Sequence, residues 1–281
     1  MESPRKFTIP TPLSLFALRS SLACCWQLNL KITIMSGSKF RIGCSGYYYT
    51  AWKNKFYPPG LQPKNWLAYY STVFNTVELN GTFYRTPKLA DLTKYAQNAV
   101  NDFKFSVKMN KYITHVLKLK DSKSQIHDFQ ELVLEGLGNK CAHFLFQLPP
   151  SFPYNEENLE RILTAIPNQT SNVVELRHIS WWNAEVEKAF TQAGLTFCNV
   201  DFPGMDTHFI HTSPHFYLRL HGNPELFKSS YSIEALESFH RKFPEGSQCY
   251  NVYFNNTYYE AGYTNALQLM ELIGKEKMVH H

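Results

Sequence analysis

Short runs of strand-like and helix-like residues alternate along the chain from Phe40 onward. Runs rich in β-branched and aromatic residues predict strands at 40–45, 76–83, 103–108, 142–148, 172–177, 195–200, 215–221 and 250–256. Between them, apolar residues recur with helical spacing at 62–74, 88–99, 124–138, 155–165, 183–193, 232–242 and 262–273. The stretch 201–214 has no helical period. Strands that alternate with helices are typical of parallel sheets with helical crossovers.

This pattern predicts an α/β fold of the TIM-like (β/α)8 barrel type, with an irregular crossover after the sixth strand. The chain has 281 residues, of which 44% are hydrophobic and 18% charged, so it can bury a substantial core and is not a disordered polyelectrolyte. Neither a G-x-G-x-x-G motif after the first strand nor a P-loop motif occurs, which removes the main support for an open nucleotide-binding sheet. We expect one domain over 39–276, followed by a tail at 277–281.

The first 38 residues differ from the rest because they show no sustained period. The apolar run from Leu13 to Leu18 is ended by Arg19, so a secretory signal is not predicted, and a transit peptide is the less favoured alternative. We expect a poorly ordered extension, with Met35 as an alternative start. Truncation to Met35 is expected to leave the melting temperature essentially unchanged. No stretch reaches membrane-spanning length without charge.

Charge and cysteine content are both unremarkable for a globular protein inside the cell. The 28 Lys and Arg exceed the 23 Asp and Glu by five, which allows anionic partners without requiring them. Six cysteines occur without a C-x-x-C pair or zinc-type spacing. Cys44, Cys141, Cys198 and Cys249 lie in or beside apolar runs, where free thiols behave as small hydrophobic groups. We therefore expect a reduced, cytoplasmic protein.

Polar residues two positions apart occur near the ends of four expected strands. These pairs are Glu78 with Asn80, Ser106 with Lys108, Glu175 with Arg177, and Arg219 with His221. Residues two apart share one face of a strand, and one face of a barrel points inward. Barrel enzymes carry their catalytic groups at the C-terminal ends of the strands. We therefore expect these side chains to converge in a polar pocket at that end.

The candidate site residues follow from this placement. Carboxylates and imidazoles that could transfer protons are the candidate catalytic residues Glu78, Glu175, His178 and His221. Amides, cations, rings and one further carboxylate are the candidate substrate-binding residues Asn80, Tyr84, Arg85, Lys108, His115, Gln147, Arg177, Trp181, Asp201, Arg219, Asn255 and Asn256. Guanidinium groups bind phosphate or carboxylate oxygens in pairs, so Arg177 and Arg219 favour an anionic ligand.

Two other interpretations of the same residues stay open. The charges could instead form a closed interior ion-pair network of Glu78, Glu175, Lys108, Arg177 and Arg219, with His178 capping a loop. A divalent metal is the less favoured alternative, held by Glu78, Glu175, Asp201, His178 and His221. No fixed ligand spacing supports that metal site, and the nearby cations would repel the ion. We therefore expect no cofactor.

Several runs of the sequence resemble the signature segments of a known family. In order between about 40 and 275 these are RIGCSGYYYTAWKNKFYPPG, TVELNGTFYRTP, FSVKMNKYITH, FLFQLPPSF, VVELRHISWW, YLRLHG and VYFNNTYYEAGYTNA. They resemble the YecE-like family, also called the domain of unknown function 72 family. The resemblance implies a TIM-like barrel and no assigned reaction. The family usually has Thr at the position of Cys44, which argues against this thiol as an obligatory nucleophile.

Three classes of function stay open from the sequence. The first is a small-molecule enzyme, of hydrolase or isomerase type, that binds a phosphorylated or sugar-like anion at the barrel mouth. The second is a nucleic-acid-binding or nuclease-like barrel, in which loop aromatics such as Tyr48, Trp52 and Trp182 contact bases. The third is a non-catalytic structural barrel, which has no need of so many charges at one rim. A steep salt dependence of DNA binding would distinguish the second class from the first.

Overall fold

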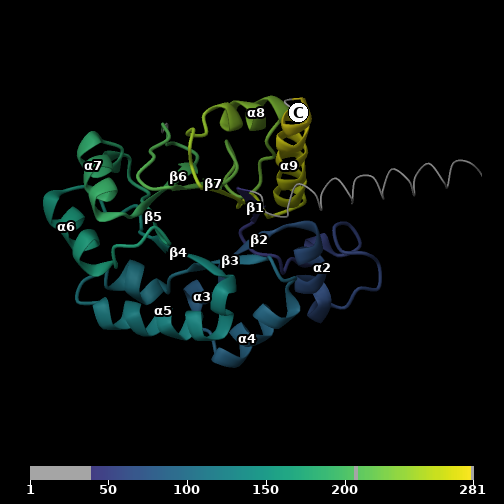
Figure 1. Cartoon of the computed structure of the whole chain (residues 1–281), viewed down its shortest axis with the longest axis horizontal. Coiled ribbons are helices and arrows are strands. Elements are labelled where there is room, and N and C mark those ends of the chain that lie inside the picture. Colours follow the sequence, from purple (N-terminus) through teal and green to yellow (C-terminus); the bar gives the residue numbers. More distant parts are fainter. Residues whose placement is uncertain (1–38, 206–207, 280–281) are drawn as a thin grey trace, which may run out of the picture. The chain divides into compact units, whose positions relative to one another are not determined.

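Eight parallel strands form a nearly closed barrel in this computed structural model, which describes residues 39–205 and 208–279. Their order in the sheet is β1-β8-β7-β6-β5-β4-β3-β2. Figure 1 shows the arrangement of the strands, with β1 to β7 labelled. The strands are β1 (Phe40–Cys44), β2 (Thr76–Leu79), β3 (Lys104–Lys108), β4 (Cys141–Gln147), β5 (Asn172–Glu175), β6 (Thr196–Asp201), β7 (His215–Leu220) and β8 (Cys249–Phe254). The predicted TIM-like barrel is confirmed.

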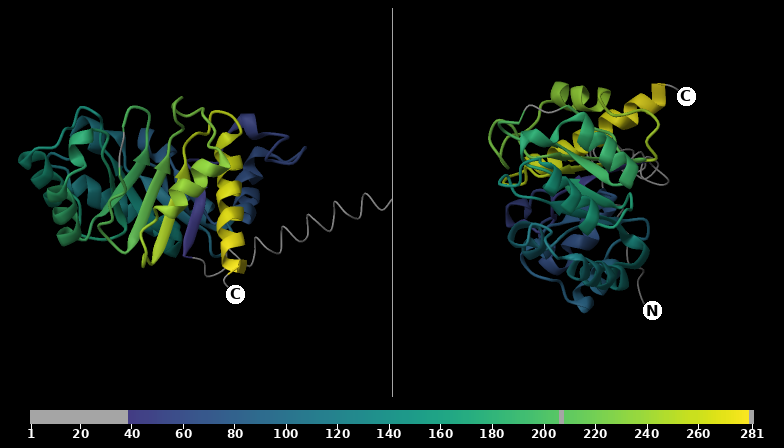
Figure 2. Two further views of the ribbon diagram at one scale, coloured as in Figure 1. Left: turned by 90° about the horizontal axis from the view of Figure 1, so that it is seen from above. Right: turned by 90° about the vertical axis from the view of Figure 1, so that its left-hand side faces the viewer.

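Helices lie around the outside of the strands, as the two views of Figure 2 show. They are α2 (Trp66–Val73), α3 (Gly81–Tyr84), α4 (Leu89–Asn98), α5 (Lys123–Leu137), α6 (Glu156–Ala165), α7 (Ala184–Ala193), α8 (Ile233–Arg241) and α9 (Ala261–Val279). The N-terminal ends of α6, α7 and α8 are capped by the side chains of Asn155, Asn183 and Ser232, which accept backbone N–H bonds. In the described part of 201–214 no helix forms, as the sequence predicted.

The seam between β1 and β2 is joined by side chains, because no backbone ladder pairs these two strands. Asn75 accepts from the N–H of Ile42 at 3.0 Å and donates to the carbonyl of Phe40 at 2.8 Å. Tyr70 Oη accepts from the N–H of Cys44 at 2.7 Å and donates to the carbonyl of Thr76 at 3.2 Å. These two side chains thus bond backbone groups that would otherwise be buried without partners.

A glycine allows this close approach of the two strands. A Cβ atom placed on Gly43 would lie 2.1 Å from the carbonyl oxygen of Thr76 and 2.9 Å from Tyr70 Oη. Those distances are shorter than any non-bonded contact, so a side chain at this position would force the strands apart.

The barrel interior consists of an apolar layer between two polar ones. The apolar cluster is formed by inward-facing residues of neighbouring strands, namely Leu145, Val173, Cys198, Val200, Tyr217 and Tyr253. At the strand starts, His143 Nε2 and His215 Nδ1 are 3.0 Å apart. The same two-residue period puts the next inward side chains of β2, β3, β5 and β7 at the opposite end, where the strands finish.

The second strand is shorter than the sequence predicts. We expected it to reach residue 83, but β2 ends at Leu79 and α3 begins at Gly81. Thr82 explains the turn, because its hydroxyl bonds to the carbonyls of Leu79 at 3.0 Å and Lys108 at 2.6 Å. Side-chain bonds of this kind compete with strand pairing.

Four cysteines are free thiols, as expected: Cys44, Cys198 and Cys249 are buried and Cys141 is half-buried. No helix in the described residues is both long and apolar enough to span a membrane. The expectations for residues 1–38 and for the end of the tail, 280–281, lie outside the described residues.

Candidate functional site

A buried arginine lies between two buried carboxylates at the C-terminal ends of the strands. Arg219, on β7, donates from Nε to Glu78 Oε2 at 3.0 Å and from Nη2 to Glu78 Oε1 at 2.5 Å. Its Nη1 donates to Glu175 Oε2 at 2.5 Å. The side chain of Arg219 is 1% exposed and those of Glu78 and Glu175 are 0% exposed. Alternation along β2, β5 and β7 therefore brings these three predicted residues together inside the barrel.

Two hydroxyl groups that the sequence analysis did not select complete the environment of Glu78 and Arg219. Tyr217 Oη donates to Glu78 Oε2 at 2.9 Å and lies 2.6 Å from Ser106 Oγ. Ser45 Oγ accepts from Arg219 Nη2 at 3.3 Å. Tyr217 could have been predicted from the sequence, because it precedes Arg219 by two residues and so shares its inward face.

The second carboxylate, Glu175, has a further arginine and a histidine beside it. Arg177 Nε donates to Glu175 Oε1 at 2.7 Å, and His221 Nε2 lies 3.5 Å from the same oxygen. Asn255 Nδ2 is 2.9 Å from His221 Nδ1. If the Asn255 amide donates there, as its assigned orientation requires, Nδ1 is the acceptor and Nε2 carries the proton. His221 Nε2 is buried and makes no hydrogen bond with the part of the chain that the structure describes.

Neither Glu175 nor His221 titrates near neutral pH. Burial alone would raise the pKa of Glu175, but the guanidinium groups of Arg177 and Arg219 hold this pKa well below its usual range. Burial lowers the pKa of His221 to about 3, although Glu175 opposes the shift. The carboxylate is therefore ionised and the imidazole neutral at pH 7.

Lys108, the last residue of β3, has no anionic partner among the described residues. Its side chain is among the buried polar groups at 9% exposure, and its Nζ lies 4.1 Å from the centre of the Phe83 ring. Nζ makes no hydrogen bond or ion pair with any described residue. Burial first, and then the positive charge of Arg219, lower the pKa of Lys108 to about 7 against the attraction of Glu175. This amine is therefore able to gain or lose a proton near neutral pH.

His115 and Gln147 lie on the same side of the mouth as Lys108. The His115 ring packs edge-on against Phe83, with centroids 4.9 Å apart. Gln147 Nε2 lies 3.4 Å from His115 Nε2. Partial burial, followed by the charges of Lys108 and Arg177, lowers the pKa of His115 to about 4. Asn80 follows β2, and its Nδ2 donates to the carbonyl of Ser45, after β1, at 3.3 Å.

The two arginines differ in how many donors they have left. Arg219 uses Nε and both Nη atoms within the cluster. Arg177 uses only Nε, and its Nη atoms make no hydrogen bond with any described residue. The Arg177 side chain is 15% exposed, and its guanidinium carbon lies 5.1 Å from the Phe202 ring. Arg177 is therefore the guanidinium with donors available to a ligand.

Two other candidates beside β5 have local structural contacts. His178 Nδ1 accepts from the N–H of Ser180 at 3.3 Å and is 2.7 Å from Ser180 Oγ, so it caps the short 3-10 helix η5 (Ile179–Trp181). This is the loop-capping role that the sequence left open. Trp181 is fully buried and donates from Nε1 to the carbonyl of Phe152 at 2.7 Å. Neither side chain bonds to the carboxylate cluster.

Three further candidates also make no bond to the cluster. Tyr84 is 79% exposed. Arg85 lines a small cavity of 110 Å³ beside α3 and α4. Asn256 Nδ2 donates to the carbonyl of Ser229 at 2.9 Å and to Asn265 Oδ1 at 3.0 Å, which fastens the loop after β8.

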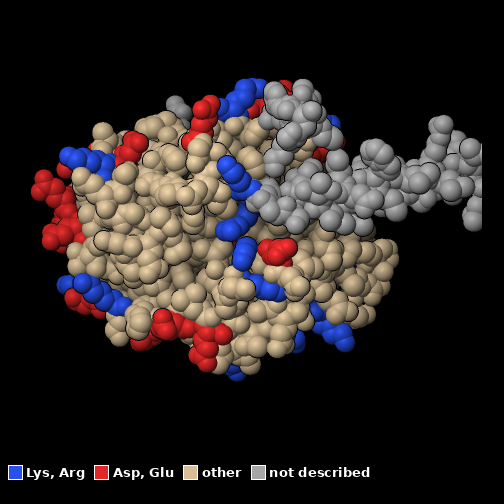
Figure 3. Space-filling model, viewed as in Figure 1, with Lys and Arg blue, Asp and Glu red and all other residues tan. Residues whose placement is uncertain are grey.

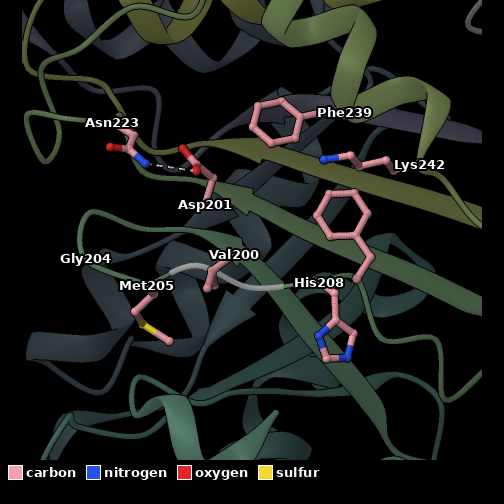
Figure 4. A pocket seen from close by; sticks show the side chains of 9 residues that line it. Val200, Asp201, Gly204, Met205, His208, Asn223, Phe239 and Lys242 are labelled. Atoms are coloured by element: carbon pink, nitrogen blue, oxygen red, sulfur yellow. Dashed lines mark hydrogen bonds between the residues drawn. The ribbon is translucent and has the colours of Figure 1, made fainter. Parts of the chain in front are cut away.

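Asp201 belongs to a separate cavity of 920 Å³ between the irregular crossover and α8 (Figure 4). The cavity is lined by Val200, Asp201, Gly204, Met205, His208, Phe209, Asn223, Phe239 and Lys242. Asp201 Oδ2 accepts from Tyr231 Oη at 2.6 Å, and Oδ1 accepts from Asn223 Nδ2 at 3.2 Å. Its carboxylate is thus bonded on the outer side of β6, whereas Cys198 packs in the barrel core.

The metal interpretation is not supported by the described residues. They contain no group of three or more His, Cys, Asp or Glu side chains placed to hold a metal ion. Glu78 and Glu175 are bonded to arginines, while His178 and Asp201 have other partners. Glu78, Glu175 and His221 do lie near one another, but Arg219 is bonded between the two carboxylates, and His178 and Asp201 do not join them.

Surface charge is a separate feature from this cluster. Figure 3 views the barrel from the end at which the strands begin, and a row of Lys and Arg crosses the middle of that face. The carboxylate–arginine cluster lies at the other end, where the strands finish. A nucleic acid attracted to the row would therefore not be held at the cluster.

The fold and this cluster define a TIM-like barrel protein with a charged site at the C-terminal ends of its strands. Residues 41–281 match the family described as Protein of unknown function DUF72, and the chain belongs to that family. A DUF72 family protein from Thermotoga maritima MSB8 has a crystal structure that is similar with a TM-score of 0.75 and 30% identity, covering 83% of this chain and 98% of that one. The resemblance stated from the sequence is confirmed.

Curated relatives match over a shorter stretch. The UPF0759 protein YecE of Escherichia coli K12 is 26% identical over 151 residues, which is 53% of this chain and 55% of the relative. The UPF0759 protein YunF of Bacillus subtilis 168 is 29% identical over 144 residues, which is 48% of this chain and 51% of the relative. The match thus spans about half the length of these relatives. A DUF72 structure from Enterococcus faecalis V583, at 16% identity and a TM-score of 0.67, shows the fold alone.

Proposed function

We propose that this barrel is a small-molecule enzyme that binds an anionic substrate at the C-terminal ends of its strands. The observation that carries the proposal is the difference between the arginines: Arg219 is fully engaged by Glu78 and Glu175, whereas the Nη donors of Arg177 are unused by the described residues. Arg219 therefore stabilises the two carboxylates, and Arg177 is the group that binds the ligand.

The charges of the cluster favour an anion. Two carboxylates, Glu78 and Glu175, balance two guanidinium groups, Arg177 and Arg219. Protonated Lys108 therefore adds one positive charge that no described side chain neutralises. A phosphate or carboxylate between Arg177 and Lys108 would supply the missing negative charge in a partly buried site, where electrostatic interactions are strong.

Proton transfer in this proposal belongs to Lys108. Efficient general acid–base groups have a pKa near the working pH, and Lys108 has a pKa of about 7. Glu175 stays ionised and orients Arg177, while the unbonded Nε2–H of His221 is available to a substrate oxygen. The Phe83 and Phe202 rings flank the two cations and suit the carbon skeleton of a phosphorylated or sugar-like molecule.

Calorimetry with inorganic phosphate tests the proposal. The wild-type protein is titrated beside Arg177→Lys and Arg177→Met, with Arg161→Lys as the control, because Arg161 pairs with Glu157 on α6 and makes no bond to the cluster. Loss of the guanidinium fork should weaken phosphate binding by about 1–2 kcal/mol, a factor of roughly 5 to 30, in Arg177→Lys. Equal affinities in the wild type and Arg177→Met would overturn the proposal, as would DNA binding that falls steeply with salt and is unaffected by Arg177→Met.

A further inference from the structure

We propose that Lys108 forms an imine with its substrate, so that the substrate class is an aldehyde or ketone that also carries a phosphate or carboxylate group. The inference rests on the proposed function, in which Arg177 binds the anionic group. It adds that the amine beside that anion is the nucleophile.

Lys108 makes no ion pair with a carboxylate among the described residues, so no bonded anion holds its amine in the charged form. The carboxylates facing it are Glu78 on β2 and Glu175 on β5, and both are already bonded by arginines. The other titratable groups around it are Arg177, Arg219 and His115. Lys108 itself is held against the Phe83 ring with no ion pair among the described residues. A lysine placed only to neutralise a carboxylate would lie within contact of one.

Only the uncharged amine attacks a carbonyl carbon. An ordinary lysine is uncharged in about one molecule in a few thousand at pH 7, whereas a lysine with a pKa of about 7 is uncharged in about half of them. Burial and neighbouring cations are the two recognised ways of making a lysine nucleophilic in this manner. Both occur at Lys108, since burial and Arg219 are the leading causes of its shift.

The step balances without any oxidant or reductant. The Nζ lone pair of Lys108 forms a bond to the carbonyl carbon, and the π electrons move to the carbonyl oxygen. The oxygen takes up two protons in all, equal in number to those that the amine nitrogen loses, and leaves as water while the C=N bond forms. Addition of water across that bond reverses the sequence and releases Lys108. His221 Nε2–H makes no hydrogen bond with the described residues and lies 3.5 Å from Glu175 Oε1, and we assign it as the donor to the oxygen.

Reductive trapping tests this inference on the full chain. The protein is incubated at pH 7 with glycolaldehyde phosphate and sodium cyanoborohydride, and the modified lysine is located by peptide mass spectrometry. Glycolaldehyde without the phosphate is the matched probe. Lys104 on the same strand is the control residue, because its Nζ is exposed and bonds only to the carbonyl of Asn139. Labelling of Lys108 should exceed labelling of Lys104 by at least about tenfold, and Lys108→Arg should abolish the main adduct.

The outcomes distinguish the two proposals. Phosphate binding that depends on Arg177, with no adduct at Lys108, overturns the imine and leaves the anion site standing. An adduct at Lys108 that forms equally well with both probes and in Arg177→Met supports the imine and contradicts the anion site. Labelling spread evenly over exposed lysines of the wild type overturns the inference whether or not the Lys108→Arg protein folds.

Discussion

Arg219 donates to Glu175 at 2.5 Å inside the barrel, where the arginine is 1% exposed and the carboxylate 0%. Removing such charges from water costs several kcal/mol for each ion, and the cost is recovered only when every donor and acceptor finds a partner. Glu78, Tyr217 and Ser45 complete that set around Arg219. Arg219 and these partners form a fully hydrogen-bonded cluster of buried charges, and such a cluster holds neighbouring binding groups in fixed positions.

Removing the central arginine should strongly destabilise the fold. Arg219→Met leaves Glu78 buried without its guanidinium partner and removes one of the two guanidinium groups bonded to Glu175, so we expect the free energy of unfolding at pH 7 to fall by about 3–5 kcal/mol. Urea denaturation measures this. Arg161→Met, which removes a surface pair on α6, should cost no more than about 1 kcal/mol. A similar small loss in both variants would show that Arg219 does not stabilise the buried cluster of charges.

The seam between β1 and β2 should depend on one hydroxyl. Tyr70→Phe leaves the N–H of Cys44 without the partner it has at 2.7 Å, so we expect a loss of about 1–3 kcal/mol in the free energy of unfolding. Tyr112 is 55% exposed, and Tyr112→Phe is the control, with an expected change within about 0.5 kcal/mol. Equal stabilities for the two variants would exclude a structural role for the Tyr70 hydroxyl.

Gly43 and Gly81 should respond in opposite ways to alanine. A Cβ on Gly43 would overlap the carbonyl of Thr76 at 2.1 Å, whereas a Cβ on Gly81 meets no atom within 4 Å. We expect Gly43→Ala to lower the melting temperature markedly, because the overlap is with backbone that cannot rotate away. Gly81→Ala, at the start of α3, should be neutral or stabilising by up to about 1 kcal/mol. Thermal unfolding followed by circular dichroism compares the two, and an unchanged Gly43→Ala protein would contradict the seam described above.

The free energy of unfolding should depend on pH above neutrality because of Lys108. The pKa of this group is about 7 in the folded protein and 10.5 in the absence of a shift. Between those values the unfolded chain binds more protons, so the free energy of unfolding rises with pH, by about 1.4 kcal/mol per pH unit for this one group. The stability difference between the wild type and Lys108→Met should therefore change in favour of the wild type from pH 7 to pH 10. A difference that stays flat in urea titrations over this range would show that Lys108 is not desolvated.

The barrel and the convergence at its mouth could be predicted because both follow from a two-residue period. Glu78, Glu175 and Arg219 each lie on the inward face near a strand end, and that placement needs no knowledge of loops. The unequal roles of Arg177 and Arg219 could not be predicted. Both were expected on the inward face near a strand end, but Arg219 lies within β7 while Arg177 follows β5 by two residues.

Asp201 shows that the sequence alone does not always predict which face of a strand points into the barrel. We expected it at the mouth, yet it shares the outer face of β6 with Asn199, which bonds to both backbone groups of Ile210. In an ordinary barrel a helix would cover that face with apolar side chains. Here the irregular crossover covers it, and its backbone requires polar partners. Asn199 and Asp201 therefore face outward, whereas Cys198 on the opposite face packs in the core.

A crystal structure determined in the presence of millimolar inorganic phosphate would show what occupies the space beside Arg177 and Lys108. We expect a phosphate with two oxygens on the Nη atoms of Arg177 and a third near Lys108 Nζ, with Arg219 still bonded to Glu78 and Glu175. Phosphate bound only at surface lysines, or a metal ion between the two carboxylates with Arg219 displaced, would contradict this expectation.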